Sequence, residues 1–432
     1  MSLEEGMFDV CFLHPAREMV DASRARELVA PLKEMKRVTR VKLSNKSYSA
    51  EAAQVVKEAL LACRESITDV DVSDVIAGRP EAEALEVLGA LATPFADSKL
   101  EVCDVSDNAL GQKGIDALLP LFSGKTLKKL RVCNNGMSAA AAEQLSALLE
   151  KSSGGLESFH YFNNMSGDQG ALSIAKIIVA NCATLRDLRF SGTRAGRVGS
   201  TAVARSLFDL KHLETLDFAD NTLSSDDGAG ALATFIETKR PPLKRLDLRD
   251  CALGNDGFKT LADALIANKN GLLESLDFSG NDLDFESCAS LPRLFLAHPR
   301  IEFFGLDDNE LGTKGVLLLA KALERNKTLT SLTISSNDIN SSGRAVTKLA
   351  NVLKDNVVFK SLNLDGNGLT ESACEQLTDI LGDKLKEMDD NDVDADPDDD
   401  ETDDELEDII AAAAKIDLSP SSPRQKKEEE DS

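Results

Sequence analysis

A short apolar pattern recurs along this 432-residue chain and constrains its fold more than any other feature. The pattern has apolar residues at its first, fourth, sixth and eleventh positions, with Asn or Cys at the ninth. Clear copies begin at Leu127, Leu213, Leu243, Leu273 and Phe359. The alternating apolar residues put two side chains on one face of a short strand. The Asn or Cys can hydrogen-bond backbone groups that the following bend leaves unpaired.

These copies indicate a series of repeats, each built from one strand and one helix. The residues at the ninth position, called ladder residues here, lie 27 to 33 residues apart, which leaves room for a full helix. We therefore predict an α/β leucine-rich-repeat horseshoe solenoid of the ribonuclease-inhibitor type, with about 12 repeats and a parallel sheet on its concave face. The ladder residues, the first two in degenerate copies, are Lys46, Val75, Asn108, Asn135, Asn164, Thr193, Asn221, Cys251, Asn281, Asn309, Asn337 and Asn367.

Charge divides the chain into a predicted solenoid over residues 1–386, with an atypical N-terminal cap over about 1–75, and an acidic tail over 387–432. The tail holds 20 acidic and 4 basic residues, so it carries −16 of the formal net charge of −25. Such a run repels itself and buries too little apolar surface to fold, so we expect a disordered tail that favours a basic partner. Ser419 and Ser422 precede proline there and are candidate phosphorylation sites.

The sequence holds no recognisable catalytic motif. It has no GxxxxGK[ST] phosphate loop, no GxGxxG after a strand and no GxSxG elbow. Its four histidines are far apart, and its eight cysteines form no CxxC pair. Clustered basic residues for nucleic acid and a long apolar run for a membrane are also missing. We expect no cofactor, no metal site, no nucleic acid and no membrane, and the repeats indicate a protein that binds another protein.

Three consecutive repeats carry a more specific signature just after their strands. The residues read SDVIAGR at 73–79, SDNALG at 106–111 and NNG at 134–136. Together with the acidic tail, these motifs resemble the Ran GTPase-activating protein family, and the resemblance covers about residues 6–408. The stretches FNNMSGDQGA and FSGTRAGRVGS are most similar to the plant and protist branch of that family.

The resemblance implies an activator of the small GTPase Ran, with no catalytic machinery of its own, that supports nucleocytoplasmic transport. In the family, the activator supplies no arginine finger. It docks on the switch regions and holds the GTPase's own catalytic Gln in a productive pose, so GTP and Mg belong to the partner. The implied partner is Ran-GTP, alone or with a Ran-binding protein. By match to the family's motifs, Arg79 and Asn134 are implied to act in GTPase activation.

The repeat pattern adds to this assignment independently. Asn135 fills a ladder position and should point inward, whereas Asn134 precedes it and should project towards a partner. Equivalent positions in other repeats are predicted to form a partner-binding ridge, although turns favour Asp and Asn in any case. For Arg79 the alternatives are a solvated loop arginine or an ion pair with Asp74. The predicted ridge residues are Asp74, Asp107, Asn163, Asp220, Asp250 and Asp308.

The chain also departs from the family's pattern. Glu81 stands where some members have a basic residue, which alters one charge contact. The repeats begin by about residue 20, so we expect neither the plant N-terminal targeting domain nor the animal C-terminal domain. The expected protein is a cytoplasmic monomer, perinuclear at most and not anchored at nuclear pores.

A non-catalytic binding module is the alternative from another functional class. An acidic leucine-rich-repeat histone chaperone also joins a solenoid to an Asp/Glu tail, but its repeats are about 24 residues long and lack a helix in each unit. Ribonuclease-inhibitor-like and immune-receptor-like repeat proteins are rich in cysteine or carry a nucleotide-binding domain. The spacing of mostly 28 to 30 residues in this chain favours the GTPase activator.

Overall fold

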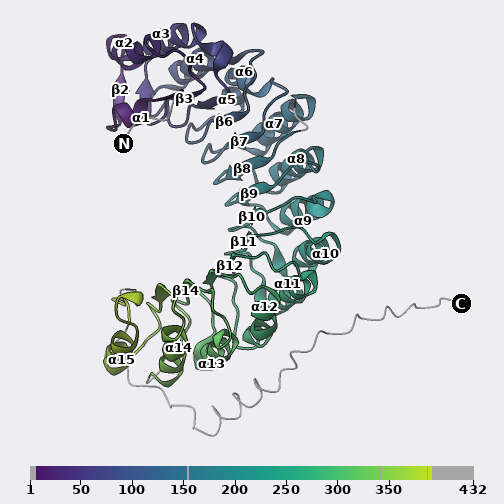
Figure 1. Ribbon diagram of the computed structural model, residues 1–432. Coiled ribbons are helices and arrows are strands. Elements are labelled where there is room, and N and C mark those ends of the chain that lie inside the picture. The colour runs from purple at the N-terminus through teal and green to yellow at the C-terminus, as the bar shows by residue number, and fades with distance from the viewer. Residues whose placement is uncertain (1–5, 153–154, 340–342, 387, 392–432) are drawn as a thin grey trace, which may run out of the picture.

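Each repeat places one short strand in a single parallel sheet, and the sheet curves into a horseshoe (Figure 1). The computed structural model describes residues 6–152, 155–339, 343–386 and 388–391. Within these residues, thirteen strands follow one another across the sheet in chain order, from β1 and β3 to β15. The predicted leucine-rich-repeat horseshoe is therefore confirmed, and its sheet has one strand more than the roughly twelve repeats predicted.

The strands are short because each repeat turns towards its helix after three to five residues. In most strands the middle residue, such as Leu130 or Leu276, is buried, and its two neighbours face the concave side. The strands β2 (Glu18–Val20) and β4 (Lys46–Tyr48) pair in a second, small sheet. The large sheet contains β1 (Met7–Asp9), β3 (Arg40–Lys42), β5 (Asp69–Asp71), β6 (Val102–Asp104), β7 (Lys129–Arg131), β8 (Ser158–Phe162), β9 (Asp187–Ser191), β10 (Thr215–Asp217), β11 (Arg245–Asp247), β12 (Ser275–Asp277), β13 (Phe303–Gly305), β14 (Ser331–Thr333) and β15 (Ser361–Asn363).

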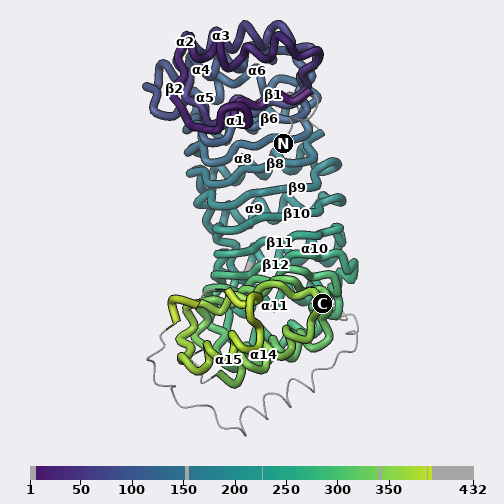
Figure 2. The backbone as a smooth tube through the Cα atoms, turned by 60° about the vertical axis from the view of Figure 1, so that its left-hand side comes forward, coloured from purple at the N-terminus to yellow at the C-terminus, as the bar shows by residue number. Residues whose placement is uncertain are grey.

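The longer helices line the convex side, and the turned view shows the repeats stacked one above another (Figure 2). Each helix buries one apolar stripe against the sheet, as Val316, Leu319 and Leu323 do in α13. The helices are α1 (Val10–Leu13), α2 (Ala22–Val29), α3 (Ala50–Leu61), α4 (Glu81–Ala92), α5 (Gly111–Ala117), α6 (Leu119–Phe122), α7 (Ala139–Ser152), α8 (Gly167–Ala180), α9 (Arg197–Ser206), α10 (Ala229–Lys239), α11 (Gly254–Asn268), α12 (Leu291–Ala297), α13 (Gly312–Leu323), α14 (Arg344–Lys354) and α15 (Glu371–Leu381).

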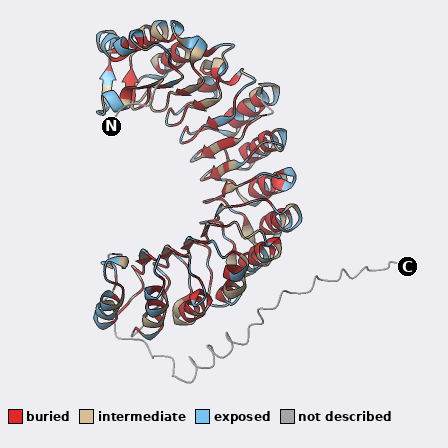
Figure 3. Ribbon diagram, in the orientation of Figure 1, coloured by how far each residue is buried: buried red, intermediate tan, exposed pale blue. Residues whose placement is uncertain are grey.

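The core is one continuous layer between the strands and the helices, and the exposed residues lie outside it (Figure 3). Aromatic rings extend this layer from repeat to repeat in the middle of the chain. The centroids of Tyr161 and Phe190 are 6.4 Å apart, and those of Phe190 and Phe218 are 5.5 Å apart. Because each repeat packs mainly on its neighbours, the solenoid is stabilised by a chain of such local interfaces.

Both ends of the solenoid contain structure that the repeat template does not indicate. The first strand, β1, lies at Met7–Asp9 and pairs with β3, within the predicted N-terminal cap and ahead of the repeats expected from about residue 20. At the other end, Leu385 bridges to Leu362, and the Asn391 side chain accepts hydrogen bonds from the N–H groups of Asn367 and Leu369. The ladder thus continues beyond the predicted boundary at residue 386, because Asn391 supplies one more amide. The rest of the predicted tail, residues 392–432, lies outside the described residues.

Candidate functional site

The ladder asparagines fix the turns at the carboxyl ends of the parallel strands. Asn281 is fully buried, and its amide donates to the carbonyl oxygens of Leu248, Phe278 and Ser279 at 2.8–2.9 Å. Its side-chain oxygen accepts from the N–H groups of Cys251 and Leu253. One side chain therefore satisfies backbone groups of two successive repeats, which is the role the sequence predicted.

At the degenerate ladder positions, Lys46 and Val75, other side-chain hydrogen bonds replace those of an asparagine. The Lys46 ammonium is buried and donates to the carbonyl oxygens of His14 at 2.8 Å and Ala16 at 2.5 Å. Val75 has no polar side chain, so the Leu43 carbonyl receives a hydrogen bond from the buried Tyr48 hydroxyl at 3.1 Å instead. The first repeats thus keep their turns without the asparagine.

The predicted ridge lies one residue before the ladder, and its backbone conformation is left-handed throughout. The φ angles lie between +51° and +61° at Asp74, Asp107, Asn134, Asn163, Asp220, Asp250 and Asp308. Gly192 and Gly280 fill the same position in other repeats, with φ angles of +57° and +67°. Asp, Asn and Gly are the residues that adopt this conformation at least cost. The backbone alone therefore accounts for the residue types of the ridge.

Asn134 is exposed and takes part in a row of side-chain hydrogen bonds along the ridge. Its amide nitrogen donates to Asp107 Oδ1 at 2.7 Å, and its side-chain oxygen accepts from the Asn163 amide at 2.8 Å. Since an amide group has two N–H donors and two lone pairs, one of each remains available to a partner. The neighbouring Asn135 is buried and donates to Val105, as predicted for a ladder residue.

Arg79 lies in the connection from β5 to α4, which is longer than its counterpart between β6 and α5. Its side chain is only 12% exposed and is held on three sides. The guanidinium donates to the Ser47 carbonyl at 2.7 Å and to the Ser47 hydroxyl at 3.0 Å, and it pairs with Glu83 at 3.2 Å. Neither alternative raised for Arg79, a solvated side chain or an ion pair with Asp74, matches this arrangement.

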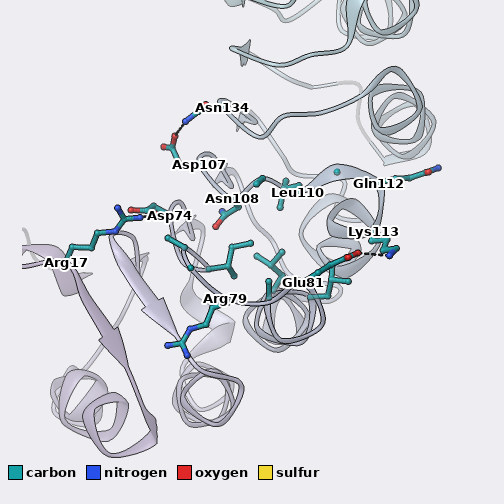
Figure 4. Close-up of a pocket in the computed structure, with 18 residues that line it drawn as sticks. Arg17, Asp74, Arg79, Glu81, Asp107, Asn108, Leu110, Gln112, Lys113 and Asn134 are labelled. Atoms are coloured by element: carbon teal, nitrogen blue, oxygen red, sulfur yellow. Dashed lines mark hydrogen bonds and ion pairs between the residues drawn. The ribbon is translucent and has the colours of Figure 1, made fainter.

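A groove of about 930 Å³ separates this connection from the turn of the next repeat (Figure 4). It is lined by four of the predicted site residues, Asp74, Arg79, Asp107 and Asn134. The guanidinium of Arg79 points away from the pair formed by Asn134 and Asp107. The remaining ridge residues, Asn163, Asp220, Asp250 and Asp308, do not line the groove, although Asn163 reaches it through its bond to Asn134.

Several residues that sequence reasoning missed complete the rim of this groove. Arg17, from the N-terminal cap, pairs with Asp74 at 2.5 Å and is 56% exposed. Glu81 pairs with Lys113 of the next repeat at 2.5 Å, so its charge is matched within the chain. No sequence signal links Arg17 to Asp74, because they are brought together only by the packing of the first three repeats.

The concave face holds one cluster that could be mistaken for a catalytic triad. His160 Nε2 lies 2.8 Å from Asp187 Oδ2 and 3.4 Å from the Ser158 hydroxyl. The same ring nitrogen meets both groups, and Ser158 itself donates to Asp187 at 2.8 Å. A triad needs Asp and Ser on opposite nitrogens of the imidazole, so this cluster is not one.

Two further observations concern metal binding and membrane insertion. In the part of the chain that the structure describes, no group of three or more His, Cys, Asp or Glu side chains is arranged to hold a metal ion. None of the helices in that part is both long and apolar enough to cross a membrane.

Comparison with known proteins supports the class that the fold defines, a leucine-rich-repeat protein. A family model described as "Leucine Rich repeat" matches residues 209–233, 241–262 and 325–345. A yeast structure of the Rad7 and Elc1 complex shares the fold, with a TM-score of 0.50 and 15% sequence identity over 85% of this chain and 81% of that one. The architecture gives an extended surface suited to binding another protein.

Two more specific relatives come from Arabidopsis thaliana. This chain is 40% identical over 111 residues to RAN GTPase-activating protein 1, which covers 26% of this chain and 21% of that protein. It is 38% identical over 131 residues to RAN GTPase-activating protein 2, which covers 30% and 23% respectively. The matched segments thus span between a fifth and a quarter of the length of these relatives.

Proposed function

We propose that this protein is a GTPase activator for Ran. The observation that carries the proposal is the groove in which Asn134, Asp107, Asp74 and Arg79 come together. These residues belong to the three motifs that resemble the Ran GTPase-activating proteins, and the partial identity to two such proteins from Arabidopsis supports it. The accompanying expectations, a cytoplasmic monomer that meets Ran-GTP alone or with a Ran-binding protein, belong to the same proposal.

The geometry of Arg79 favours activation without an arginine finger. A finger has to extend into the partner's nucleotide site, where its charge stabilises the transition state. Arg79 instead uses its guanidinium to join the loop to Ser47 and Glu83. We assign it a positioning role: it holds the loop beside the groove, and the loop presents its surface to the GTPase.

Asn134 is the residue that meets the partner in this proposal. Its hydrogen bonds to Asp107 and Asn163 fix the amide in one orientation, while one donor and one acceptor stay free. A fixed amide can order a group on the switch regions of Ran and so hold the GTPase's own Gln over the attacking water. Positioning of this kind accelerates a reaction without new covalent chemistry.

Single-turnover GTP hydrolysis by Ran, with catalytic amounts of this protein, tests the proposal. Because the backbone of Asn134 is left-handed, Asn134→Gly removes the amide without adding strain. We expect it to lower the stimulated rate about 100-fold, the scale of losing one oriented polar group. Ser336→Gly is the matched control, since Ser336 is exposed and occupies the same left-handed row with a φ of +49°.

Each outcome of this experiment has a definite meaning. Stimulation by the wild type that Asn134→Gly abolishes and Ser336→Gly preserves supports both the activity and the site. Equal loss in both variants would place the effect in the ridge as a whole, against a special role for Asn134. No stimulation by folded wild-type protein would refute the proposal and favour the non-catalytic binding module.

A second experiment separates the two roles open to Arg79. Arg79→Ala removes both contacts of the guanidinium with the preceding repeat, whereas Ser47→Ala removes the hydroxyl contact and leaves the contact with the Ser47 carbonyl. If Arg79 positions the loop, Ser47→Ala lowers the stimulated rate as well, and the double variant is scarcely worse than Arg79→Ala alone. Additive losses in the double variant would mean that Arg79 acts on the GTPase directly.

A further inference from the structure

A second groove, of about 880 Å³, lies at the N-terminal end of the solenoid and carries the opposite charge to the chain as a whole. It runs between α3 on one side and α2 with the short helix η1 (Ala30–Lys33) on the other, and the loops that lead from helix to strand also line it. In a parallel sheet these loops lie at the edge opposite the ridge, so this basic groove is separate from the groove that holds Asn134.

Four cations line the basic groove: Arg26, Lys33, Lys36 and Arg37. All four are exposed, and none has an ion-pair partner within the described part of the chain. Neighbouring cations outside the groove behave differently. Arg24, for example, pairs with Glu18 at 3.0 Å and Glu27 at 2.8 Å. In a chain with a net charge of −25, four adjacent unmatched cations call for an acidic occupant.

The floor of the basic groove is apolar. Leu32 and Val29 are buried, while Met35, Val55 and Ala59 are partly buried and pack against the core. Two acids, Glu58 and Glu65, also line it, and Glu65 lies 3.6 Å from Arg64. Cations around an apolar floor fit a segment that carries carboxylates on one side and apolar side chains on the other.

The chain contains such a segment. Residues 401–414 read ETDDELEDIIAAAA, which is six acidic residues among the first eight, followed by an apolar run. Leu406, Ile409, Ile410 and Ala413 follow the spacing of one helical face, with carboxylates on the other side. We infer that this acidic–apolar segment docks in the basic groove of its own chain, with the helical face on Met35 and Val55 and its carboxylates on the four cations.

The chain that follows Asn391 is long enough to bring the acidic–apolar segment to the basic groove. Thirteen strands about 4.8 Å apart give the sheet an arc of about 58 Å, and the straight line across a horseshoe is shorter than its arc. Residues 392–403 in extended form reach about 42 Å, and a helix over residues 404–414 adds about 16 Å, so the far end of the segment lies up to about 58 Å from Asn391, the last residue of the ladder. Because the tether joins the segment to the groove of the same molecule, docking within one chain does not depend on protein concentration.

Carbodiimide cross-linking of the full chain tests the inference, because the reagent joins a carboxylate to a lysine in contact with it. The expected products link Glu405, Glu407 or Asp408 to Lys33 or Lys36, about fivefold above links to Lys327. Lys327 is exposed on the same edge at the other end of the solenoid. Even spreading over the surface lysines would overturn the inference, since that is the signature of nonspecific condensation.

Two pairs of variants make the test specific. K36E/R37E should lower the Lys33 links about fivefold, whereas R325E/K327E, an equal charge change at the other end, should leave them unchanged. Replacing Leu406, Ile409 and Ile410 by Ser retains every carboxylate, and we expect the Lys33 links to fall here too. Links that survive these serines would overturn the inference.

Mixing chains labelled with 14N and 15N distinguishes docking within one chain from docking between copies. We expect the Lys33 links to join residues of the same isotope at all protein concentrations. Mixed-isotope links as the main product would place the segment on a second copy and contradict the inference. None of these outcomes bears on GTP hydrolysis, because the basic groove lies at the opposite edge from the proposed Ran site.

Discussion

Asn134 and Asn135 are neighbours in one turn, but they belong to two rows that place different demands on the same side chain. Asn135 lies in the buried ladder, where its oxygen accepts from the Asn108 N–H at 2.8 Å and its amide donates to Val105. Asn134 lies in the exposed ridge, where its amide hydrogen-bonds to Asp107 and Asn163. The ladder uses the hydrogen-bonding capacity of its amides within the chain, whereas the ridge leaves part of it unused.

The backbone of the ridge by itself favours acidic and amide side chains. Every ridge position has a positive φ, so Asp, Asn or Gly is expected there whether or not a partner binds. Residue type alone is therefore weak evidence for contact. Position beside a groove, exposure and unused hydrogen-bonding capacity are stronger evidence, and among the ridge residues Asp107 and Asn134 are exposed and line the groove.

Substitutions in the ladder and in the ridge should differ most in their effect on the free energy of unfolding. Asn135→Ala leaves the buried N–H of Asn108 unpaired, so we expect it to lower the free energy of unfolding by about 3 kcal/mol. Asn134→Gly removes an exposed side chain at a position that glycine tolerates, and should change it by less than about 0.5 kcal/mol. Urea unfolding followed by circular dichroism measures both. Equal losses in the two variants would show that the rows are not distinct.

A smaller effect tests how the ladder is completed where it lacks asparagine. The Tyr48 hydroxyl donates to the Leu43 carbonyl in the buried turn before Val75. Tyr48→Phe retains the ring and leaves that carbonyl unpaired, so we expect a loss of about 1.5 kcal/mol in the free energy of unfolding. Tyr161→Phe is the control, because its buried hydroxyl has no hydrogen-bond partner in the described structure and its removal should cost less. A larger loss for Tyr161→Phe would contradict this account.

Much of the fold was predictable because the repeat template encodes it directly. Period-two apolar residues predict the strands, and a recurring Asn predicts the turns, so both follow from the sequence without knowledge of distant contacts. The first strand escaped notice because Met7–Asp9 is not followed by a ladder amide. The placement of Asn134 outside and Asn135 inside was also predictable, since it follows from their position relative to the strand.

The contacts of Arg79 were not predictable in the same way. Its partner Ser47 lies 32 residues away, in a repeat whose template is degenerate, and the contact depends on how two repeats pack. The pairing of Arg17 with Asp74 spans 57 residues and has the same origin. Repeat patterns fix where a backbone turns, but the partners of long side chains are set by packing between repeats, which the template does not describe.

The smallest effect that we predict concerns pH and Asp277, a charged residue of the concave face. The ladder amides do not titrate, whereas burial raises the pKa of the Asp277 carboxyl on the concave face, even though Ser279 donates to it. A raised pKa means that the folded state holds the proton more firmly than the unfolded state. The stability contributed by Asp277 is therefore fully present below its ordinary pKa and is lost as pH rises through the raised value.

Asp277→Asn should remove this loss, because an amide keeps an acceptor for Ser279 and does not ionise. We expect the variant to gain on the order of 0.5 kcal/mol over the wild type between pH 4 and pH 7, with the gain growing as pH rises. Urea midpoints measured at each pH give this difference directly. A gain that is constant with pH would contradict this account, because it would mean that Asp277 is ionised in the folded state as readily as in the unfolded one.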